Sequence, residues 1–373
     1  MITNEIDYLQ VFAITVESRF WKECLLTLNS KAPTLNDVAD LAGVSRATAS
    51  RALAGYGRIS DKTVEVVQKA AKTLGYRPNE VARAMRAGKT RTIGLVVISD
   101  FTNAFFDRAT KAIIDAAKQH GYQTVVSHTD EDVANEREAV QTLIEKRVDG
   151  LIVVPASDSE HDHLRASRLG STPLVLIDRK LEAVNFPSVT TGDYQGAIEA
   201  VDFAHQKGHR NMAFIVAVPG VTEATFVRPH IPISTVVDRT DGFAAAIKKL
   251  KIDSQMLFCR DNQADAAEAV EQLLLKPNRP TILFTSNNDM LLAVLKVAGK
   301  LKISIGKDLS VVSFDDSPWA AAMSPAITVI SRPVDELGRL AVQMLLSQIN
   351  GEQKAKSQVL PTELISRDSV ATI

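Results

Sequence analysis

The sequence predicts an α/β protein in which a small N-terminal helix-turn-helix unit precedes a larger core built from parallel sheets. Two observations support this fold class. Residues 34–53 hold two short helical patterns separated by a glycine, and from residue 92 onward short apolar runs alternate with helical patterns over roughly 220 residues. Strands that are apolar throughout and alternate with helices are typical of parallel sheets covered on both faces.

Length and composition fit two or three globular domains. The chain has 373 residues, of which 45% are hydrophobic and 23% charged. Cys24 and Cys259 cannot form a disulfide framework, so we expect a reducing cytoplasm. No stretch approaches the roughly 20 apolar residues that a membrane span needs. The first residues also lack the basic leader and apolar run of a secretory signal.

The net charge of −1 hides an asymmetry along the chain. Residues 31–91 carry twelve Lys or Arg against five Asp or Glu, whereas residues 92–373 are net negative. A basic module joined to an acidic body favours attraction to a phosphate backbone at one end only. A solvated basic face without a partner is the alternative.

The segment from Thr34 to Leu53 predicts two crossing helices. Apolar residues recur at helical spacing in the first helix, Gly43 breaks the pattern, and Ser45 can cap the second helix. The recurring apolar residues of the first helix are Val38, Ala39, Leu41 and Ala42, and the predicted inward residues of the second are Ala49, Ala52 and Leu53. Such a pair is either a helix-turn-helix, whose second helix fits the DNA major groove, or an ordinary helical hairpin.

A third helix should follow, capped by Ser60 or Asp61 and ended by Gly75. Its apolar stripe consists of Val64, Val67, Ala70, Ala71 and Leu74. Residues 78–88 predict a helical segment too short to be stable alone. There Met85 lies between Arg83 and Arg86, which suits either a minor-groove wedge or a linker residue packed on its own domain.

Polar side chains gather where the predicted strands of the core end. Parallel sheets bind ligands beyond the carboxyl ends of their strands, and carboxylates and amides there suit the hydroxyl groups of sugars. Phe105, Phe106 or Trp319 can stack on a sugar ring. The strand-end residues are Asp100, Asn103, Asp158, Asp178, Arg179, Asn287, Asn288, Asp289, Asp315 and Asp316.

No catalytic or nucleotide signature accompanies these strand ends. The Walker loop, G-x-G-x-x-G and G-x-S-x-G patterns are all missing from the sequence. His161 and His163 stand in the polar stretch SDSEHDH, which predicts a solvated loop rather than a metal site. His209 is expected to shape the KGHRN turn. We therefore predict neither an enzyme nor a metal or cofactor.

The order of these parts resembles the LacI/GalR family of bacterial transcription repressors. The resemblance rests on TLNDVADLAGVSRATASRAL, YRPNEVARAMRAG and TIGLVV, and in the core on VDGLIV, GDYQGA, KGHRN, DRTDGF, SNNDM and LSVVSFDD. It covers residues 33 to about 370 and leaves residues 1–30 outside. It implies a two-subdomain, periplasmic-binding-protein-like core that holds a sugar, nucleoside or related metabolite as effector, and a cytoplasmic homodimer that binds palindromic operator DNA.

The resemblance also implies roles for residues of the N-terminal unit. By position, Arg46, Ala47 and Arg51 would face base edges, and Met85 would take the wedge position, where the family usually has Leu. Asn79 and Ala82 would lie along the hinge. The full set implied to contact DNA is Thr34, Leu35, Ser45, Arg46, Ala47, Thr48, Ser50, Arg51, Arg58, Asn79, Ala82, Met85 and Arg86.

In the core, Arg239, Asn288 and Asp315 match effector-contacting positions of the family. Each has a structural alternative: Arg239 can pair with Asp241, Asn288 can cap a helix starting at Asp289, and Asp315 can cap a turn. The segment 219–237 is longer than is usual for the family, and we place the start of its helix at Asp241. The remaining candidate contacts are Phe105, Phe106, Asp158, Asp178, Arg179 and Trp319.

These inferences divide the chain into an extension (1–32), a helix-turn-helix headpiece (33–77), a hinge helix and linker (78–91) and an effector-binding and dimerisation core (92–373). Within the core we expect an N-subdomain at about 92–190 and 326–352, and a C-subdomain at about 191–325 and 353–373. A solute-binding transport protein and a sugar-modifying enzyme are the alternatives. The first should lack the basic headpiece, and the second should show a catalytic base and a phosphate loop.

Overall fold

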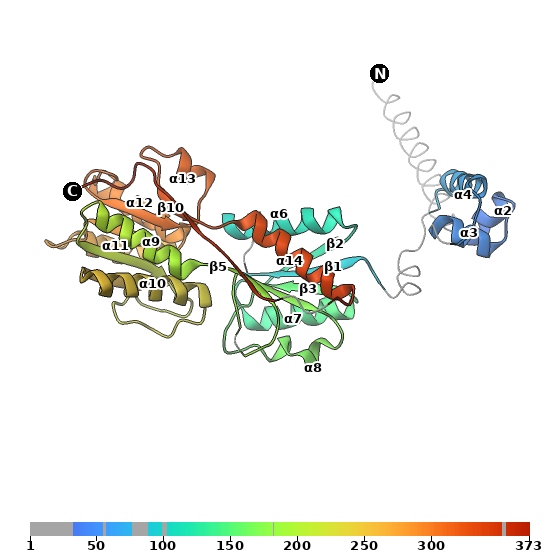
Figure 1. Ribbon diagram of the computed structural model, residues 1–373, viewed down its shortest axis with the longest axis horizontal. Helices are drawn as coiled ribbons and strands as arrows, with labels where there is room; N and C mark the ends of the chain where they lie inside the picture. The colour runs from blue at the N-terminus through green and yellow to red at the C-terminus, as the bar shows by residue number, and fades with distance from the viewer. Residues whose placement is uncertain (1–32, 55–56, 77–88, 99–102, 182, 353–355) are drawn as a thin grey trace, which may run out of the picture. The chain divides into compact units, whose positions relative to one another are not determined.

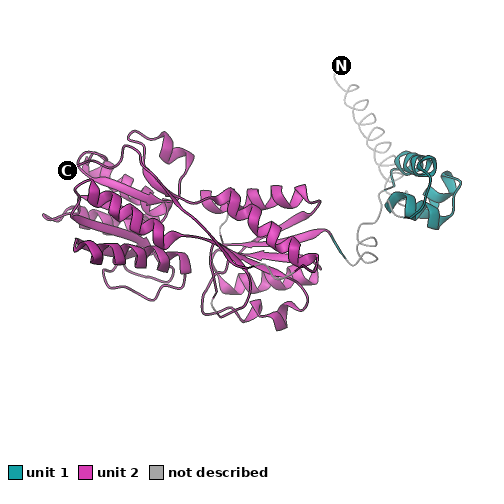
Figure 2. Cartoon of the chain, viewed as in Figure 1, with its two compact units in different colours: residues 1–90 teal, residues 91–373 magenta. Residues whose placement is uncertain are grey.

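The structure is a computed structural model that describes residues 33–54, 57–76, 89–98, 103–181, 183–352 and 356–373. The chain forms two compact units, residues 1–90 and 91–373, drawn in different colours in Figure 2. The predicted hinge residues Asn79, Ala82, Met85 and Arg86 lie outside the described residues. None of the helices described is long and apolar enough to cross a membrane.

The described residues of the N-terminal unit form three helices, α2 (Leu35–Leu41), α3 (Arg46–Ala54) and α4 (Asp61–Leu74). Ser45 accepts a hydrogen bond from the Thr48 N–H at 3.1 Å, Ser60 caps α4, and Gly75 ends it with a left-handed backbone. Their shared core is formed by Val38, Ala39, Ala49, Ala52, Val67, Ala70 and Ala71. Leu41, which shares the helical spacing of Val38, is the last residue of α2 and is 54% exposed.

The described strands of the larger unit form two six-stranded sheets. We call each sheet with its covering helices a lobe, the first and the second. The first lobe begins with β1 (Thr92–Val97), α6 (Ala104–Gln119), β2 (Gln123–His128), α7 (Val133–Glu145), β3 (Gly150–Val153), η1 (Asp162–Leu164), α8 (Ala166–Leu169), β4 (Leu174–Ile177) and β5 (Ser188–Thr191).

The second lobe follows with α9 (Asp193–Gln206), β6 (Asn211–Ala217), α10 (Ser234–Leu250), β7 (Asp253–Cys259), α11 (Gln263–Leu274), β8 (Ile282–Thr285), α12 (Asn288–Leu301), β9 (Ser310–Phe314), α13 (Pro318–Ala322) and β10 (Thr328–Ser331). The chain ends with α14 (Val334–Ile349), β11 (Gln358–Leu360) and β12 (Glu363–Ile365). Figure 1 labels α9 to α14 and β10 among these elements.

The two lobes repeat one topology. The strand order is β11-β5-β4-β3-β1-β2 in the first sheet and β12-β10-β9-β8-β6-β7 in the second, and every pairing is parallel except that of β12 with β10. Apolar clusters pack on both faces of each sheet. In the first lobe they involve α6 and α14 on one face and α7 on the other. In the second lobe they involve α9 and α10, then α11 and α12. The predicted parallel, doubly covered sheets are confirmed.

The chain passes between the lobes three times, at β5–α9, β10–α14 and β11–β12. The predicted subdomain boundaries miss two of these passages. Strand β10 was expected in the N-subdomain but pairs with β9 in the second lobe, because its residues Thr328–Ser331 extend that sheet. Strand β11 was expected in the C-subdomain but pairs with β5 in the first lobe. Strands of three or four residues beside a domain boundary have too short a hydrophobic pattern to indicate which sheet they join.

Helix α10 also begins earlier than its predicted start at Asp241. It starts at Ser234, so the end of the long 219–237 segment is helical and places Thr235 and Arg239 on the helix. The helix packs closely on α9 at Gly242, where a Cβ atom would lie 2.2 Å from the carbonyl oxygen of Tyr194. Glycine is therefore required by backbone contact at this crossing.

Candidate functional site

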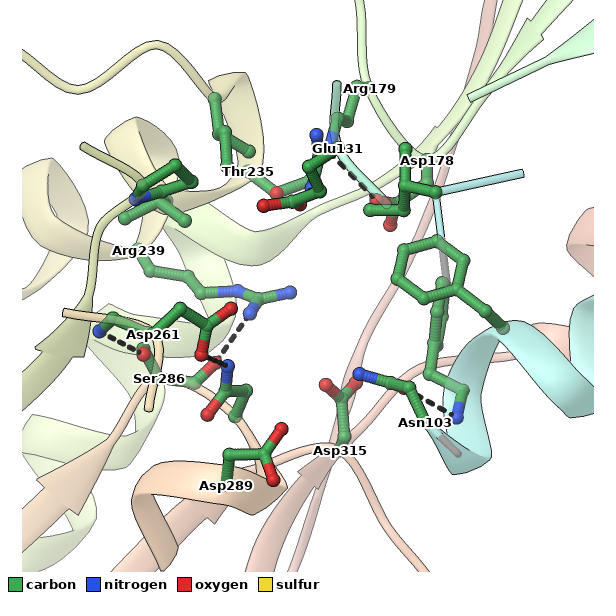
Figure 3. A pocket seen from close by; sticks show the side chains of 18 of the residues that line it. Asn103, Glu131, Asp178, Arg179, Thr235, Arg239, Asp261, Ser286, Asp289 and Asp315 are labelled. Carbon is green, nitrogen blue, oxygen red and sulfur yellow. Dashed lines mark hydrogen bonds and ion pairs between the residues drawn. The ribbon is translucent and has the colours of Figure 1, made fainter. Parts of the chain in front are cut away.

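A cavity of about 380 Å³ lies where the carboxyl ends of both sheets meet. Its volume is in the range of small-molecule sites. The first lobe contributes Ile98, Asn103, Phe105, Phe106, Asp130, Glu131, Asp178 and Arg179. The second lobe contributes Ala217, Pro219, Ile233, Thr235, Val236, Arg239, Asp261, Ser286, Asn287, Asp289 and Asp315, and Arg332 comes from the second passage between the lobes. Many of these side chains are drawn in Figure 3.

Arg332 ties the two lobes together at this cavity. Its guanidinium Nε donates to Asp315 and its Nη1 donates to Asp178, each at 2.6 Å. It also lies 3.5 Å from the centre of the Phe105 ring. Burial by itself lowers the pKa of Arg332, but Asp315 and Asp178 raise it above its ordinary value. The result is a buried, fully charged bridge from β4 in the first lobe to β9 in the second.

Asp178 and Asp315 reach Arg332 because of their backbone conformation. Each directly follows its strand with a left-handed backbone, at φ 67° and φ 72°. Aspartate tolerates this region better than most residues, since its short side chain can hydrogen-bond locally. Burial raises the pKa of Asp178, while Arg332 and Arg179 oppose the shift.

A second buried arginine, Arg239, belongs to the second lobe. Its Nε donates to Asp193 at 2.6 Å, and its Nη1 donates to the Ser286 carbonyl at 2.5 Å. The guanidinium also lies 4.5 Å from the centre of the Phe314 ring. Figure 3 shows this side chain extending into the cavity. Because Asp193 starts α9 at the first passage between the lobes, Arg239 is held by the same crossover region that shapes the site.

A third arginine, Arg179, closes the first-lobe wall. Its Nη1 donates to the Pro155 carbonyl at 3.0 Å, and its Nη2 forms an ion pair with Glu131. Its Nε lies 3.9 Å from Asp178 and makes no hydrogen bond within the described chain. Glu131 and Arg179 thus neutralise each other along the rim of the first lobe.

The second-lobe wall is acidic at Asp261 and Asp289. Asp261 receives a hydrogen bond from Asn287 Nδ2 at 3.4 Å, and Asp289 receives one from Gln263 Nε2 at 2.7 Å. Although Asp261 keeps accessible surface toward the cavity, the surrounding protein atoms desolvate it. This desolvation, followed by repulsion from Glu131 and Asp289, raises its pKa to about 6.

The structure brings six of the nine candidate effector contacts to the cavity: Phe105, Phe106, Asp178, Arg179, Arg239 and Asp315. The other three are absent from its lining. Asp158 is on an exposed loop 3.9 Å from His230. Asn288 is the first residue of α12, and its neighbour Asn287 lines the wall instead. Trp319 packs half-buried against the core of the second lobe.

The structural alternatives for these residues are also resolved. Arg239 pairs with Asp193, whereas Asp241 pairs with Arg228 at 2.5 Å. Asn287, and not Asn288, caps α12 through the Met290 N–H. Asp315 binds Arg332 and is not the cap of the following helix, which is Ser317.

Sequence reasoning missed several lining residues, and Arg332 is the most consequential. It directly follows β10, so the rule that ligands bind beyond strand ends would have found it had ITVIS been recognised as a strand. Asp130, Glu131 and Asp261 follow β2 and β7 in the same way. Thr235 and Ser286 were also missed.

The histidine expectations had mixed outcomes. His161 and His163 do not form a solvated loop: both are buried, and His163 Nε2 lies 2.6 Å from Glu136 of α7. The pairing with a distant carboxylate explains why a polar stretch turns inward. His209 shapes its turn as predicted, between Thr281 and the Ala371 carbonyl. Within the described residues, no group of three His, Cys, Asp or Glu could hold a metal ion.

The N-terminal unit presents the predicted recognition helix α3. Arg46, Ala47 and Arg51 are exposed on it, as is Arg58 beyond it. Thr34 and Asp37 form a capping box, in which the Thr34 hydroxyl donates a hydrogen bond to the Asp37 carboxylate at 2.8 Å. Leu35 is half-buried against the three-helix core, so its contact with DNA would use only part of its side chain.

The fold and site together define a class of protein: a two-lobed small-molecule binding core linked to a helix-turn-helix unit. Residues 34–79 match the model of the bacterial regulatory proteins of the lacI family, and residues 201–370 match that of the periplasmic binding protein-like domain. The chain is 31% identical over 341 residues to catabolite control protein A of Priestia megaterium, covering 90% of this chain and 98% of that protein. This protein belongs to the LacI family of bacterial transcriptional regulators.

Two solved structures extend the comparison. The Lac repressor dimer bound to operator and the anti-inducer ONPF superposes with a TM-score of 0.77, at 26% identity, over 91% of this chain and all of that one. The complex of the transcriptional regulator CelR with cellobiose gives a TM-score of 0.66, also at 26% identity, over 90% and 99% of the two chains. The predicted family, fold class and regulatory function are confirmed, and the family consists of regulators rather than enzymes.

Proposed function

We propose that this chain is a cytoplasmic homodimeric repressor whose affinity for a palindromic operator is set by a sugar-like or nucleoside-like effector bound between its lobes. The cavity is the observation that carries the proposal, because both lobes and the Arg332 passage line it. A ligand there has different contacts in the open and closed arrangements of the lobes, which is what a shift between two states requires.

On the DNA side, α3 is proposed to enter the major groove. Arg46 and Arg51 supply exposed cations for guanine edges or phosphates, whereas Ala47 offers only a methyl contact. Specificity therefore falls mainly on the two arginines. The wedge role of Met85 stays a prediction from the sequence. The variant Met85→Gly should weaken specific operator binding without changing effector affinity.

The test is selection of bound sequences from random duplex DNA with the purified full chain at fixed salt concentration. We expect enrichment of one palindrome. The variant Arg51→Ala should lose about 1–3 kcal/mol of discrimination at one base pair. The control Lys69→Ala, at an exposed position of α4, should leave the selected sequence unchanged. Retention that is salt-sensitive but independent of sequence, with and without metabolites, would contradict the proposal.

A further inference from the structure

The cavity contains more negative than positive charge. Among the described residues, its lining holds the carboxylates of Asp130, Glu131, Asp178, Asp261, Asp289 and Asp315 against three guanidinium groups. The guanidinium groups already have partners inside the protein. Arg332 binds Asp178 and Asp315, Arg179 binds Glu131, and Arg239 binds Asp193 behind the wall.

Two carboxylates on the second-lobe wall are left without a cation. Within the described chain, Asp261 and Asp289 receive hydrogen bonds only from the amides of Asn287 and Gln263, and no Lys or Arg pairs with either. They also repel each other, and Glu131 of the first lobe repels Asp261. Arg179, which pairs with Glu131, acts on Asp261 in the opposite sense, so the negative charge of this wall comes chiefly from Asp261 and Asp289 themselves.

A second feature of the wall points to a ligand. Arg239 is only 4% exposed, and its Nε and Nη1 donate to protein acceptors. Figure 3 shows its guanidinium directed into the cavity, beside Asp261 and Ser286. A buried donor directed into a cavity calls for an acceptor there, such as a hydroxyl or ring oxygen of a ligand.

A protonated organic amine can supply the positive charge that this wall lacks. Three His, Cys, Asp or Glu side chains grouped to hold a metal ion are not found in the part of the chain that the structure describes. A protonated amine can donate to Asp261 and Asp289 and reduce the repulsion from Glu131 at the same time. A carboxylate or phosphate at this place would add to the repulsion.

We propose that the effector is an aminated polyol, such as an amino sugar, whose ammonium group lies at Asp261 and Asp289 while its hydroxyl groups reach Arg239. This inference rests on the proposed function of the cavity and specifies the charge of its ligand.

The experiment uses the full chain and sugars grouped by charge: glucose, glucosamine and glucuronate, then the galactose, mannose and ribose series with their amino and acid counterparts. Calorimetry at neutral pH measures each dissociation constant, and release of the selected operator measures the response. We expect an amine to bind about tenfold or more tightly than its neutral counterpart, because a charge-assisted hydrogen bond contributes at least that much. The acid counterparts should bind most weakly.

Matched variants locate the effect. Asp261→Asn and Asp289→Asn should each weaken amine binding about tenfold while changing binding of the neutral counterpart less than twofold. Asp253→Asn, at the opposite end of β7, is the control and should change neither. Circular dichroism would show that each variant is folded.

Two outcomes overturn the inference while the proposed function stands: operator binding that responds to a neutral or acidic compound as strongly as to its amine, and operator binding that responds to no amine. Absence of any selected operator would instead contradict the proposed function itself.

Discussion

The two lobes share one strand order, yet the residues that follow equivalent strands differ in charge. Asp178 after β4 and Asp315 after β9 occupy equivalent places, have the same left-handed backbone and bind the same guanidinium of Arg332. The residues that follow them, Arg179 and Asp316, are opposite in charge. Arg179 turns into the cavity and pairs with Glu131, whereas Asp316 turns away and pairs with Arg367 at 2.8 Å.

This difference separates the role of the scaffold from the role of the individual side chain. The repeated topology places a carboxylate from each lobe at the same depth, so that one arginine can join them. The side chains that differ between the two lobes decide the charge of each wall. Arg179 neutralises the rim of the first lobe, whereas Asp261 and Asp289 of the second lobe pair with no cation among the described residues. The following variants test this division.

The largest effect is expected at the bridge between the lobes. Arg332→Met would leave Asp178 and Asp315 buried without their cation, which costs about 3–5 kcal/mol for a buried pair. Urea unfolding of the full chain, followed by far-ultraviolet circular dichroism, would measure the loss. Arg108→Met is the matched control, because Arg108 and Asp335 are 52% and 64% exposed and their pair contributes less than about 1 kcal/mol.

A repair variant sharpens this test. Replacing Asp178 and Asp315 by Asn together with Arg332→Met removes the unpaired charges and should recover part of the stability. If Arg332→Met destabilised the chain no more than Arg108→Met, the bridge would not contribute to the stability of the core.

The second comparison concerns the helix pair on one face of each sheet. A Cβ at Gly242 of α10 would lie 2.2 Å from the Tyr194 carbonyl oxygen of α9, while one at Gly338 of α14 would lie 2.8 Å from the Ala112 Cβ of α6. Overpacking typically costs about 1–3 kcal/mol. We expect Gly242→Ala at the upper end, because the overlap there is deeper and falls on a carbonyl oxygen, and Gly338→Ala at the lower end, because the nearest backbone atom, the Ala109 carbonyl oxygen, would lie 3.1 Å away.

Thermal unfolding of both variants would measure the difference. Gly299→Ala is the control, since nothing lies within 4 Å of its Cβ position in α12, and it should stabilise the helix by about 0.5–1 kcal/mol. Equal losses at Gly242 and Gly338 would mean that the α9–α10 crossing relaxes as easily as the α6–α14 crossing.

The repeated part of this architecture is what the sequence predicts well. Continuous apolar runs such as TIGLVV and PLVLID identify strands buried on both faces, and the polar residues after them mark the site. This reasoning placed Asp178, Arg179 and Asp315 correctly at the cavity. It succeeds because a strand end is a local property of the chain.

What depends on pairing between distant segments was not predicted. Arg332 matters because it stands between carboxylates 154 and 17 residues away, and β10 and β11 join sheets that their few residues do not specify. His163 is buried because its Nε2 pairs with Glu136, which lies on α7. The polarity of the local sequence predicts that Arg332 and His163 are exposed to solvent. Only the tertiary structure reveals the carboxylates with which they pair.

The smallest effect concerns the acidic wall and its pH dependence. The folded-state pKa of Asp261 is about 6, above its ordinary value of 3.8, because of desolvation and repulsion from Glu131 and Asp289, opposed by Asn287 and Arg179. Between these values the folded chain binds more protons at this group than the unfolded chain. The contribution of Asp261 to the free energy of unfolding therefore decreases as the pH rises from about 4 to about 6.

The variant Asp261→Asn cannot titrate at this position, so its unfolding free energy should rise relative to that of the native chain as the pH increases through that window. The accessible surface of Asp261 allows solvent screening, and we expect a difference below about 1 kcal/mol. Urea unfolding at pH 4.5 and 7, with Asp253→Asn as control, would measure it. Since the first-lobe counterpart Glu131 is paired with Arg179, identical pH profiles for the native chain and Asp261→Asn would indicate that the second-lobe wall is as well neutralised as the first.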